Sequence, residues 1–264
     1  MNNRIRVLNQ AAPIAIAETY SNGDGPLNLI FSDVDTIAVI LTNRCLAACA
    51  HCYNYSGPKG SRFLDKELIK AFVGQITEGR RRLRVGFSGG EPFLHPDLNE
   101  ILLECSIAGH SVSCTTGLKG VSIAQLDNAI DNGLKKLAIS WDRYHAKFVR
   151  LDDVLSAANF AAGKTEIVIQ LGEVYPGEMA EKAREICCST RDTVKVDLYP
   201  IQRVGRAEKL NLNVRALDQG KVVHTNKIIS LNFDGKVYTS CSVDGFGEDD
   251  FMGMATEFIE DLDA

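Results

Sequence analysis

Three cysteines lie close together in the segment from Leu41 to Tyr55: Cys45, Cys49 and Cys52. Residues that favour loops flank the three thiols, so we expect a loop whose sulfurs converge around a bound group. An iron-sulfur cluster held by three thiolates, with one iron open to an outside ligand, fits this set, because structural zinc usually takes four protein ligands. His51 is a conceivable fourth ligand for zinc, so the spacing leaves both metals open.

A second motif, Ser88-Gly89-Gly90-Glu91-Pro92, follows further along the chain. Its glycines allow backbone groups to approach a ligand closely, and Pro92 fixes the turn. With both motifs in this order, the chain resembles the radical S-adenosylmethionine (radical SAM) superfamily. In that superfamily the cysteine triplet holds a 4Fe-4S cluster whose open iron site binds the amino and carboxylate groups of SAM, and the glycine turn binds the SAM amino group. The resemblance thus implies these two cofactors, with Cys45, Cys49 and Cys52 as metal ligands and Gly89, Gly90 and Glu91 as cofactor-binding residues.

The resemblance also implies further contacts to SAM. His51 fills the place of an aromatic residue that packs near adenine, and Tyr53 is a second candidate for that contact, or a purely structural residue. The remaining candidates end expected strands, where relatives place polar contacts to the SAM carboxylate or ribose: Thr116, Ser140 and Gln170. Relatives often read Ser-Ile-Asp-Gly after the fourth strand, whereas this chain reads Ser-Trp-Asp-Arg over residues 140–143. This departure leaves the ribose contacts and the substrate rim open.

Two residues are candidates for catalysis. His145 lies in a polar loop, and histidine is the side chain most easily set to titrate near neutrality, so we expect an acid-base or substrate-binding role, with a hydrogen-bonded loop histidine as the alternative. Cys241 is the one late cysteine, and by resemblance to radical SAM epimerases it is a hydrogen-atom donor to the substrate radical, or else an ordinary buried thiol. Arg203 and Arg206 follow the sixth expected strand, where a guanidinium suits a carboxylate or SAM. The Cys187-Cys188 pair is a weaker candidate for an extra metal site.

The elements that position these residues alternate between strands and helices. Residues 36–41 are apolar and β-branched on successive positions, as in a strand buried on both faces of a parallel sheet. The expected strands are 36–41, 84–87, 111–114, 136–140, 166–171 and 194–199, and the expected helices are 65–76, 96–108, 122–132, 152–162 and 177–189. Parallel neighbours need crossover connections, so the pattern fits either an α/β barrel or a doubly wound open sheet. The resemblance favours the partial (β/α)6 barrel of the radical SAM type.

Three segments are expected along the chain: an N-terminal extension over 1–35, the partial barrel over 36–205, and a C-terminal hairpin and helix extension over 206–264. The N-terminal segment is irregular and is a candidate for an edge strand or hairpin. In the last segment, Asp234-Gly235 between two β-rich stretches predicts a hairpin with a tight type I′ turn. This tail resembles the start of the SPASM or Twitch extension of peptide-modifying radical SAM enzymes, although it brings one cysteine where that extension brings several. An auxiliary cluster is therefore not expected.

Composition limits the cellular compartment and the binding partners that we expect for the chain. The chain has 264 residues, 45% of them hydrophobic, and a net charge of −5, so we expect a globular protein with no nucleic-acid partner. We expect neither a signal peptide nor a membrane span, because no apolar run approaches the ~20 residues that a span needs. The eight cysteines then indicate reduced thiols and a cytoplasmic protein.

By resemblance, the chain is a radical SAM enzyme that reductively cleaves SAM to methionine and a 5′-deoxyadenosyl radical, which abstracts hydrogen from a substrate. The most similar enzymes modify ribosomally made peptides, so we expect a peptide substrate and an epimerisation, crosslink or other C-H modification. A small metabolite such as a sugar, nucleoside or amino acid is the alternative substrate. A zinc-stapled binding module is the alternative outside this class. No flavin or nicotinamide fingerprint is present, which implies an external electron donor of the flavodoxin or ferredoxin type.

Overall fold

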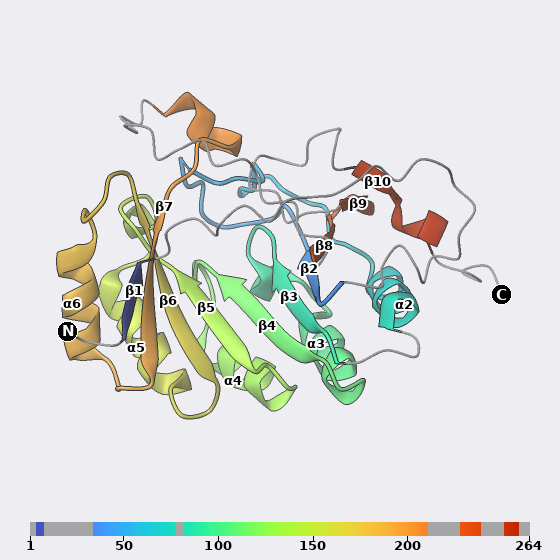
Figure 1. Cartoon of the computed structure of the whole chain (residues 1–264), viewed down its shortest axis with the longest axis horizontal. Coiled ribbons are helices and arrows are strands. Elements are labelled where there is room, and N and C mark those ends of the chain that lie inside the picture. Colours follow the sequence, from blue (N-terminus) through green and yellow to red (C-terminus); the bar gives the residue numbers. More distant parts are fainter. Residues whose placement is uncertain (1–3, 8–33, 78–81, 211–227, 239–250, 259–264) are drawn as a thin grey trace.

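The computed structural model describes residues 4–7, 34–77, 82–210, 228–238 and 251–258. Within these residues a single sheet has the strand order β1-β7-β6-β5-β4-β3-β2-β8-β9-β10 (Figure 1). The strands are β1 (Ile5–Val7), β2 (Thr36–Ile40), β3 (Arg84–Ser88), β4 (Ser111–Thr116), β5 (Lys136–Ser140), β6 (Glu166–Glu173), β7 (Val194–Pro200), β8 (Ile228–Leu231), β9 (Lys236–Tyr238) and β10 (Phe251–Met254).

The strands from β2 to β7 are the six that the sequence predicts. They lie side by side in chain order and are all parallel, because a helix crosses over between each pair. Those helices are α2 (Lys66–Thr77), α3 (Leu98–Ile107), α4 (Ile123–Asp131), α5 (Leu151–Ala161) and α6 (Ala180–Ser189). The sheet curves without closing, and the helices lie along its outer side (Figure 1). The predicted partial barrel is confirmed.

The local sequence signals explain where several helices begin. Asp65 accepts a hydrogen bond from the Leu68 amide and caps α2. At α4, Ser122 and Gln125 form a reciprocal capping box. Under the helices the strands are buried on both faces, as the consecutive buried residues 167–169 of β6 illustrate. These elements form the rigid frame to which the loops at the carboxyl ends of the strands are attached.

Segments outside the six central strands widen the same sheet. β1 joins the edge next to β7, in line with the expected edge strand, and the Arg4 guanidinium fastens it by donating hydrogen bonds to the Val194 and Cys187 carbonyls. On the opposite side β8 pairs in parallel with β2, and β8 and β9 form the expected hairpin.

The turn of that hairpin differs from the predicted type I′. Gly235 has a positive φ of 82°, but Asp234 does not, and a type I′ turn needs positive φ at both central residues. The pairing instead closes one residue further out, where the Asn232 amide donates to the Lys236 carbonyl and the Gly235 amide donates to the Asn232 carbonyl. The hairpin therefore has a loop longer than two residues, in which Gly235 adopts a left-handed conformation directly before β9.

Among the described residues, no helix combines the length and the apolar character needed to cross a membrane.

Candidate active site

The glycine turn after β3 lies directly against the chain that leads to the cysteines. The Gly90 amide donates to the Thr42 carbonyl at 2.7 Å and the Glu91 amide to the Arg44 carbonyl at 2.8 Å. Gly89 has a φ of +140°, and a Cβ built there would lie 2.6 Å from the Thr42 carbonyl oxygen. A Cβ at Gly90 would overlap the Arg44 carbonyl. Both glycines are therefore required for two loops to pack together, in addition to any ligand that they contact.

Cys45, Cys49 and Cys52 are all free thiols in the loop after β2, and Cys49 is buried. Burial raises the pKa of Cys45 to about 11 and that of Cys49 to about 12, with a smaller contribution in the same direction from the neighbouring cysteines. The Cys52 thiol donates to Asn54 Oδ1 at 2.9 Å. Buried thiols that resist ionisation alone become good ligands once a cation compensates their charge, so the set fits an iron-sulfur cluster with three thiolates.

Arg206 reaches this loop from the far side of the barrel, at the start of the 3-10 helix η3 (Gly205–Lys209) that follows β7. Its Nε donates to the Cys49 carbonyl at 2.9 Å, and its amide donates to the Cys52 carbonyl at 3.1 Å. The guanidinium charge lowers the pKa of Cys45 and Cys49 against the larger effect of burial. The other arginine that the sequence offered here, Arg203, is exposed. The structure thus brings one of the two to the cysteines.

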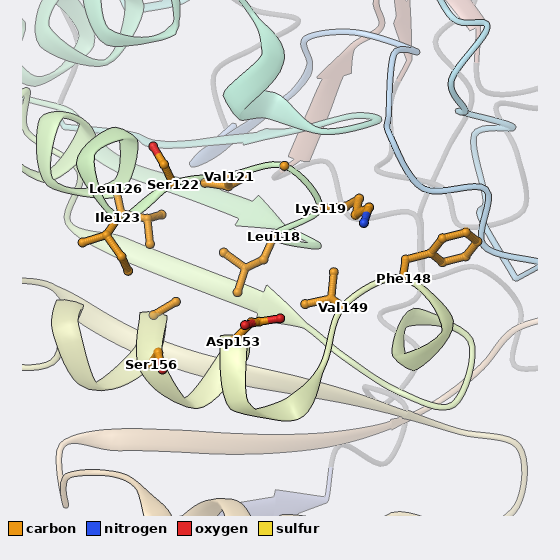
Figure 2. Close-up of a pocket in the computed structure, with 12 residues that line it drawn as sticks. Leu118, Lys119, Val121, Ser122, Ile123, Leu126, Phe148, Val149, Asp153 and Ser156 are labelled. Carbon is orange, nitrogen blue, oxygen red and sulfur yellow. The ribbon is translucent and has the colours of Figure 1, made fainter.

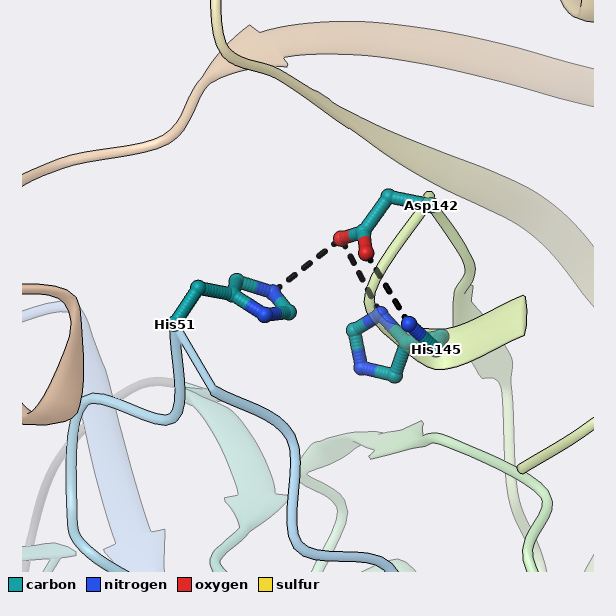
Figure 3. Close-up of side chains that lie close together, drawn as sticks. All are labelled: His51, Asp142 and His145. Carbon is teal, nitrogen blue, oxygen red and sulfur yellow. Dashed lines mark hydrogen bonds and ion pairs between the residues drawn. The ribbon is translucent and has the colours of Figure 1, made fainter. Parts of the chain in front are cut away.

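His51, Asp142 and His145 form a compact cluster beside the cysteine loop (Figure 3). Asp142 is fully buried, and its Oδ2 lies 3.0 Å from His51 Nε2 and 3.0 Å from His145 Nδ1. Burial alone would raise the pKa of Asp142, but the close imidazoles of His145 and His51 outweigh it and hold the pKa below its usual range. His51 also stacks on Tyr144, with ring centroids 5.0 Å apart. One carboxylate therefore orients two imidazoles that come from different loops.

Glu91 points inward, away from solvent. Its carboxylate accepts hydrogen bonds from the Thr116 hydroxyl at 2.8 Å and from the Gly117 and Phe93 amides, and it caps the 3-10 helix η1 (Pro92–Leu94). Burial raises its pKa to about 7, against the opposing effect of these donors. Thr116 is itself buried, and its hydroxyl also accepts from the Leu118 amide. In this structure the pair fixes the glycine turn to the end of β4.

The other residues that the sequence predicts lie at the carboxyl ends of neighbouring strands. Ser140 and Gln170 are partners in the register of β5 and β6, and the Ser140 hydroxyl donates to Gln170 Oε1 at 3.4 Å. The Tyr53 hydroxyl lies 3.4 Å from Ser88 Oγ at the end of β3. The structure thus places these side chains at the same edge of the sheet as the cysteine loop. Cys241 lies outside the described residues.

Sequence reasoning did not assign a role to Asp142 or Asn54. Asp142 lies three positions before His145 in the sequence, but its contact with His51 joins loops that are far apart in sequence. Asn54 accepts from the Cys52 thiol and from the Ser56 hydroxyl through one oxygen. A polar residue two positions after the last cysteine is the only signal that pointed to it.

Cys187 and Cys188 do not form a paired site on α6. Cys187 is buried and Cys188 is exposed, because consecutive helical residues point in different directions. No third metal-ligating side chain of the described residues joins them in a cluster.

A separate pocket of about 390 Å³ opens between α4, α5 and the loops that precede them (Figure 2). Leu118, with a φ of +61°, points into it, and Ile123 and Phe148 contribute apolar surface. None of the cysteines, imidazoles or strand-end residues described above lines it. The pocket is therefore distinct from the candidate site.

Replacing Asp142 tests how far the two imidazoles depend on it. We expect Asp142→Asn to lower the free energy of unfolding by about 3 kcal/mol, because a neutral amide cannot replace the buried carboxylate that both imidazoles face. Urea denaturation measures the change. The matched control is Asp127→Asn, which removes an exposed ion pair with Lys164 and is expected to cost less than about 1 kcal/mol. Equal effects of the two substitutions would contradict a structural role for the cluster.

An open parallel α/β barrel with three free thiols at the end of its first strand, beside a glycine turn, defines a cluster-binding barrel enzyme. The chain belongs to the radical SAM superfamily, whose family model matches residues 39–170. Members of this superfamily are enzymes that use a 4Fe-4S cluster and SAM, and these are the cofactors of this chain.

Three known proteins illustrate the similarity. The putative peptide biosynthesis protein YydG of Bacillus subtilis is 26% identical over 221 residues, which cover 78% of this chain and 69% of YydG. GTP 3′,8-cyclase of Chlorobaculum tepidum is 28% identical over 131 residues, 46% of this chain and 38% of the cyclase. The structure of SuiB from Streptococcus suis bound to its precursor peptide SuiA has a TM-score of 0.66 at 12% identity, over 88% of this chain and 64% of SuiB. This last likeness is one of fold.

Proposed function

We propose that this chain is a radical SAM enzyme that modifies a peptide at a C-H bond, with the reaction centred on the loop after β2. The observation that carries the proposal is that three free thiols lie in a loop joined to the glycine turn by backbone hydrogen bonds. Both lie at the carboxyl end of the first barrel strands. Ligands of parallel α/β folds bind at that end of the sheet. When bound, the cluster and SAM supply a 5′-deoxyadenosyl radical that takes a hydrogen atom from the substrate.

In this proposal the residues of the chain bind and orient the cofactors. Cys45, Cys49 and Cys52 hold the cluster, and the backbone of the glycine turn holds the SAM amino group. Glu91 acts from behind the turn, because its carboxylate is fully buried and already bonded to Thr116 and Gly117. The remaining residues that we assign to SAM are His51, Tyr53, Thr116, Ser140 and Gln170. Thr116 acts through its hydrogen bond to Glu91. His145 is the candidate acid-base residue.

Support for a peptide substrate comes from the extent of the likeness to YydG. That similarity spans 78% of the chain, including regions beyond the matched radical SAM family, whereas the similarity to GTP 3′,8-cyclase covers 46%. A peptide-biosynthesis protein therefore shares more of this chain than a nucleotide cyclase does. The bond that is formed or broken in the peptide stays open between epimerisation, crosslinking and another C-H change.

The second candidate is a radical SAM enzyme that acts on a small metabolite. It is favoured by the 28% identity with GTP 3′,8-cyclase over 131 residues. Mass spectrometry separates the two candidates: reaction mixtures with short peptides encoded beside the gene should show a SAM-dependent mass or stereochemical change in the peptide. Consumption of a nucleotide or sugar, with every such peptide unchanged, would favour the metabolite.

Electrons must come from a separate protein in this proposal, of the flavodoxin or ferredoxin type. We place the enzyme in the cytoplasm, where thiols stay reduced and an oxygen-sensitive cluster is protected. All seven cysteines of the described residues are free thiols, which is compatible with that compartment.

Anaerobic reconstitution with iron and sulfide tests the chemistry directly. We expect about four irons per chain, absorbance at about 400 nm, and 5′-deoxyadenosine after addition of SAM and a reductant. The deoxyadenosine assay is run with and without candidate substrate, since some members cleave SAM only when substrate is bound. Protein that binds zinc but no iron would contradict the proposal.

Cys241 gives a prediction about the end of the reaction. If its thiol returns a hydrogen atom to the substrate radical, Cys241→Ala is expected to keep 5′-deoxyadenosine formation within about twofold while product formation stops, because the thiol acts only after hydrogen abstraction. Chromatography of deoxyadenosine and mass spectrometry of the product in deuterium oxide measure the two steps. Unchanged product yield would exclude this role for Cys241.

A further inference from the structure

We propose that Arg206 is the positioning residue of the cluster: it clamps the cysteine loop through two backbone carbonyls and offers its guanidinium Nη2 to the bound cluster, whose reduction potential it raises. This inference rests on the proposed function, since it assigns a partner to the site described above. Nothing in the cysteine motif itself reveals it, because Arg206 lies 157 residues beyond Cys49 in the chain.

The first step of the argument is the double attachment to the loop. Arg206 Nε donates to the Cys49 carbonyl, and the Arg206 amide donates to the Cys52 carbonyl. Two of the three candidate ligand residues therefore have their backbone held by one residue. A metal ligand is positioned by its backbone as well as by its side chain, so this clamp limits how far the second and third sulfurs can move.

The second step is the close approach that makes the clamp possible. Gly205 has a φ of +59°, and a Cβ built there would lie 2.6 Å from the Cys52 carbonyl oxygen and would overlap the Tyr53 carbonyl. Only glycine allows η3 to lie this near to the loop. The Gly-Arg pair therefore acts as one unit, in which the glycine gives access and the arginine makes the bonds.

The third step is the unused donor. Arg206 Nη2 is buried and has no hydrogen-bond partner within the part of the chain that the structure describes. A buried guanidinium N-H without an acceptor carries a free-energy cost. An acceptor bound at this place removes that cost. The same guanidinium donates through Nε to the carbonyl of Cys49, so Nη2 lies beside the loop that carries the candidate ligands. A cluster sulfide or a ligand sulfur is an acceptor of the right charge at this place.

A positive charge and a hydrogen bond at an iron-sulfur cluster favour the reduced, more negative form and so raise the reduction potential. Loss of the charge should make the cluster harder to reduce, and loss of the clamp should make iron easier to remove. These two effects separate in two variants: Arg206→Lys keeps a charge without the planar fork, whereas Arg206→Gln keeps a short polar side chain without the charge. Arg203→Gln is the matched control, because Arg203 lies on the same segment and is exposed.

The experiment compares the reconstituted chain with these three variants. Iron per chain, the rate of iron loss to a chelator, and the midpoint potential of the cluster by anaerobic redox titration are measured, with circular dichroism of the protein before reconstitution as the test of folding. We expect about tenfold faster iron loss in both Arg206 variants, a more negative potential in Arg206→Gln than in Arg206→Lys, and wild-type values in Arg203→Gln.

The outcomes distinguish this inference from the proposed function. Wild-type protein that takes up no iron would overturn the proposed function, and with it the inference. Wild-type protein with a full cluster, together with Arg206→Gln that matches Arg203→Gln in iron loss and potential, would overturn the inference alone. Should Arg206→Gln fail to fold, Arg206→Lys decides, since wild-type rates of iron loss in that variant would rule out the clamp.

Discussion

Cys49→Ala is expected to remove the iron-sulfur cluster and all 5′-deoxyadenosine formation. Cys49 is the most buried of the three candidate ligands, and Arg206 holds its carbonyl. Without its thiolate the cluster keeps two protein ligands, and a small buried side chain offers no replacement for the missing sulfur. Iron analysis of the reconstituted variant should give below about one iron per chain, against about four in the wild type.

The matched control for this substitution is Cys188→Ala. Cys188 is exposed on α6, so its loss should change neither iron content nor deoxyadenosine formation. The control also tests the alternative that the Cys187-Cys188 pair binds a second cluster, because a drop in iron would then appear in this variant as well. A Cys49→Ala protein with full iron and full activity would leave the cysteine assignment without support.

Gly90→Ala is expected to have the second largest effect. The added methyl group would overlap the Arg44 carbonyl, which accepts the Glu91 amide and immediately precedes Cys45. Backbone cannot move aside as a flexible side chain does, so we expect the free energy of unfolding to fall by about 2 kcal/mol. Displacement of the loop should also lower iron retention, and it does so without touching any sulfur. Urea denaturation and iron analysis measure the two effects.

Gly57→Ala is the control for the glycine substitution. Gly57 lies in the same loop, and its carbonyl accepts a hydrogen bond from the Cys45 amide. A Cβ built at Gly57, however, has no heavy atom within 4 Å. Its replacement should therefore change stability by no more than about 0.5 kcal/mol. If Gly57→Ala and Gly90→Ala were equally harmful, glycine flexibility throughout the loop, rather than the contact with Arg44, would be the cause.

The six central strands and the five helices between them could be predicted from sequence because each follows a local rule. Apolar, β-branched runs such as 36–41 are buried on both faces, and Asp65 and Ser122 mark helix starts through hydrogen bonds to residues three positions away. The motif residues were also visible, since their spacing is local. Their position at the carboxyl ends of the strands follows from the parallel order alone.

The contacts that assemble the site could not be predicted in the same way, because they join distant segments. His51 meets Asp142, and Cys49 meets Arg206, only after the barrel has curved. Sequence patterns report which residues are polar, but not which loop will face which. The inward orientation of Glu91 is a further example: its carboxylate has donors on another strand end, at Thr116 and Gly117, that no local pattern connects to it.

The placement of β8 beside β2 has a consequence for how the cysteine loop is supported. With β3 on one side and β8 on the other, the strand that leads to the loop has ladder partners along both of its edges. In a six-stranded barrel that began at β2, this strand would instead present a row of unpaired amides and carbonyls, which invites pairing with another chain. Pairing with β8 thus leaves β2 without a free edge at which a second copy of the chain could add a strand.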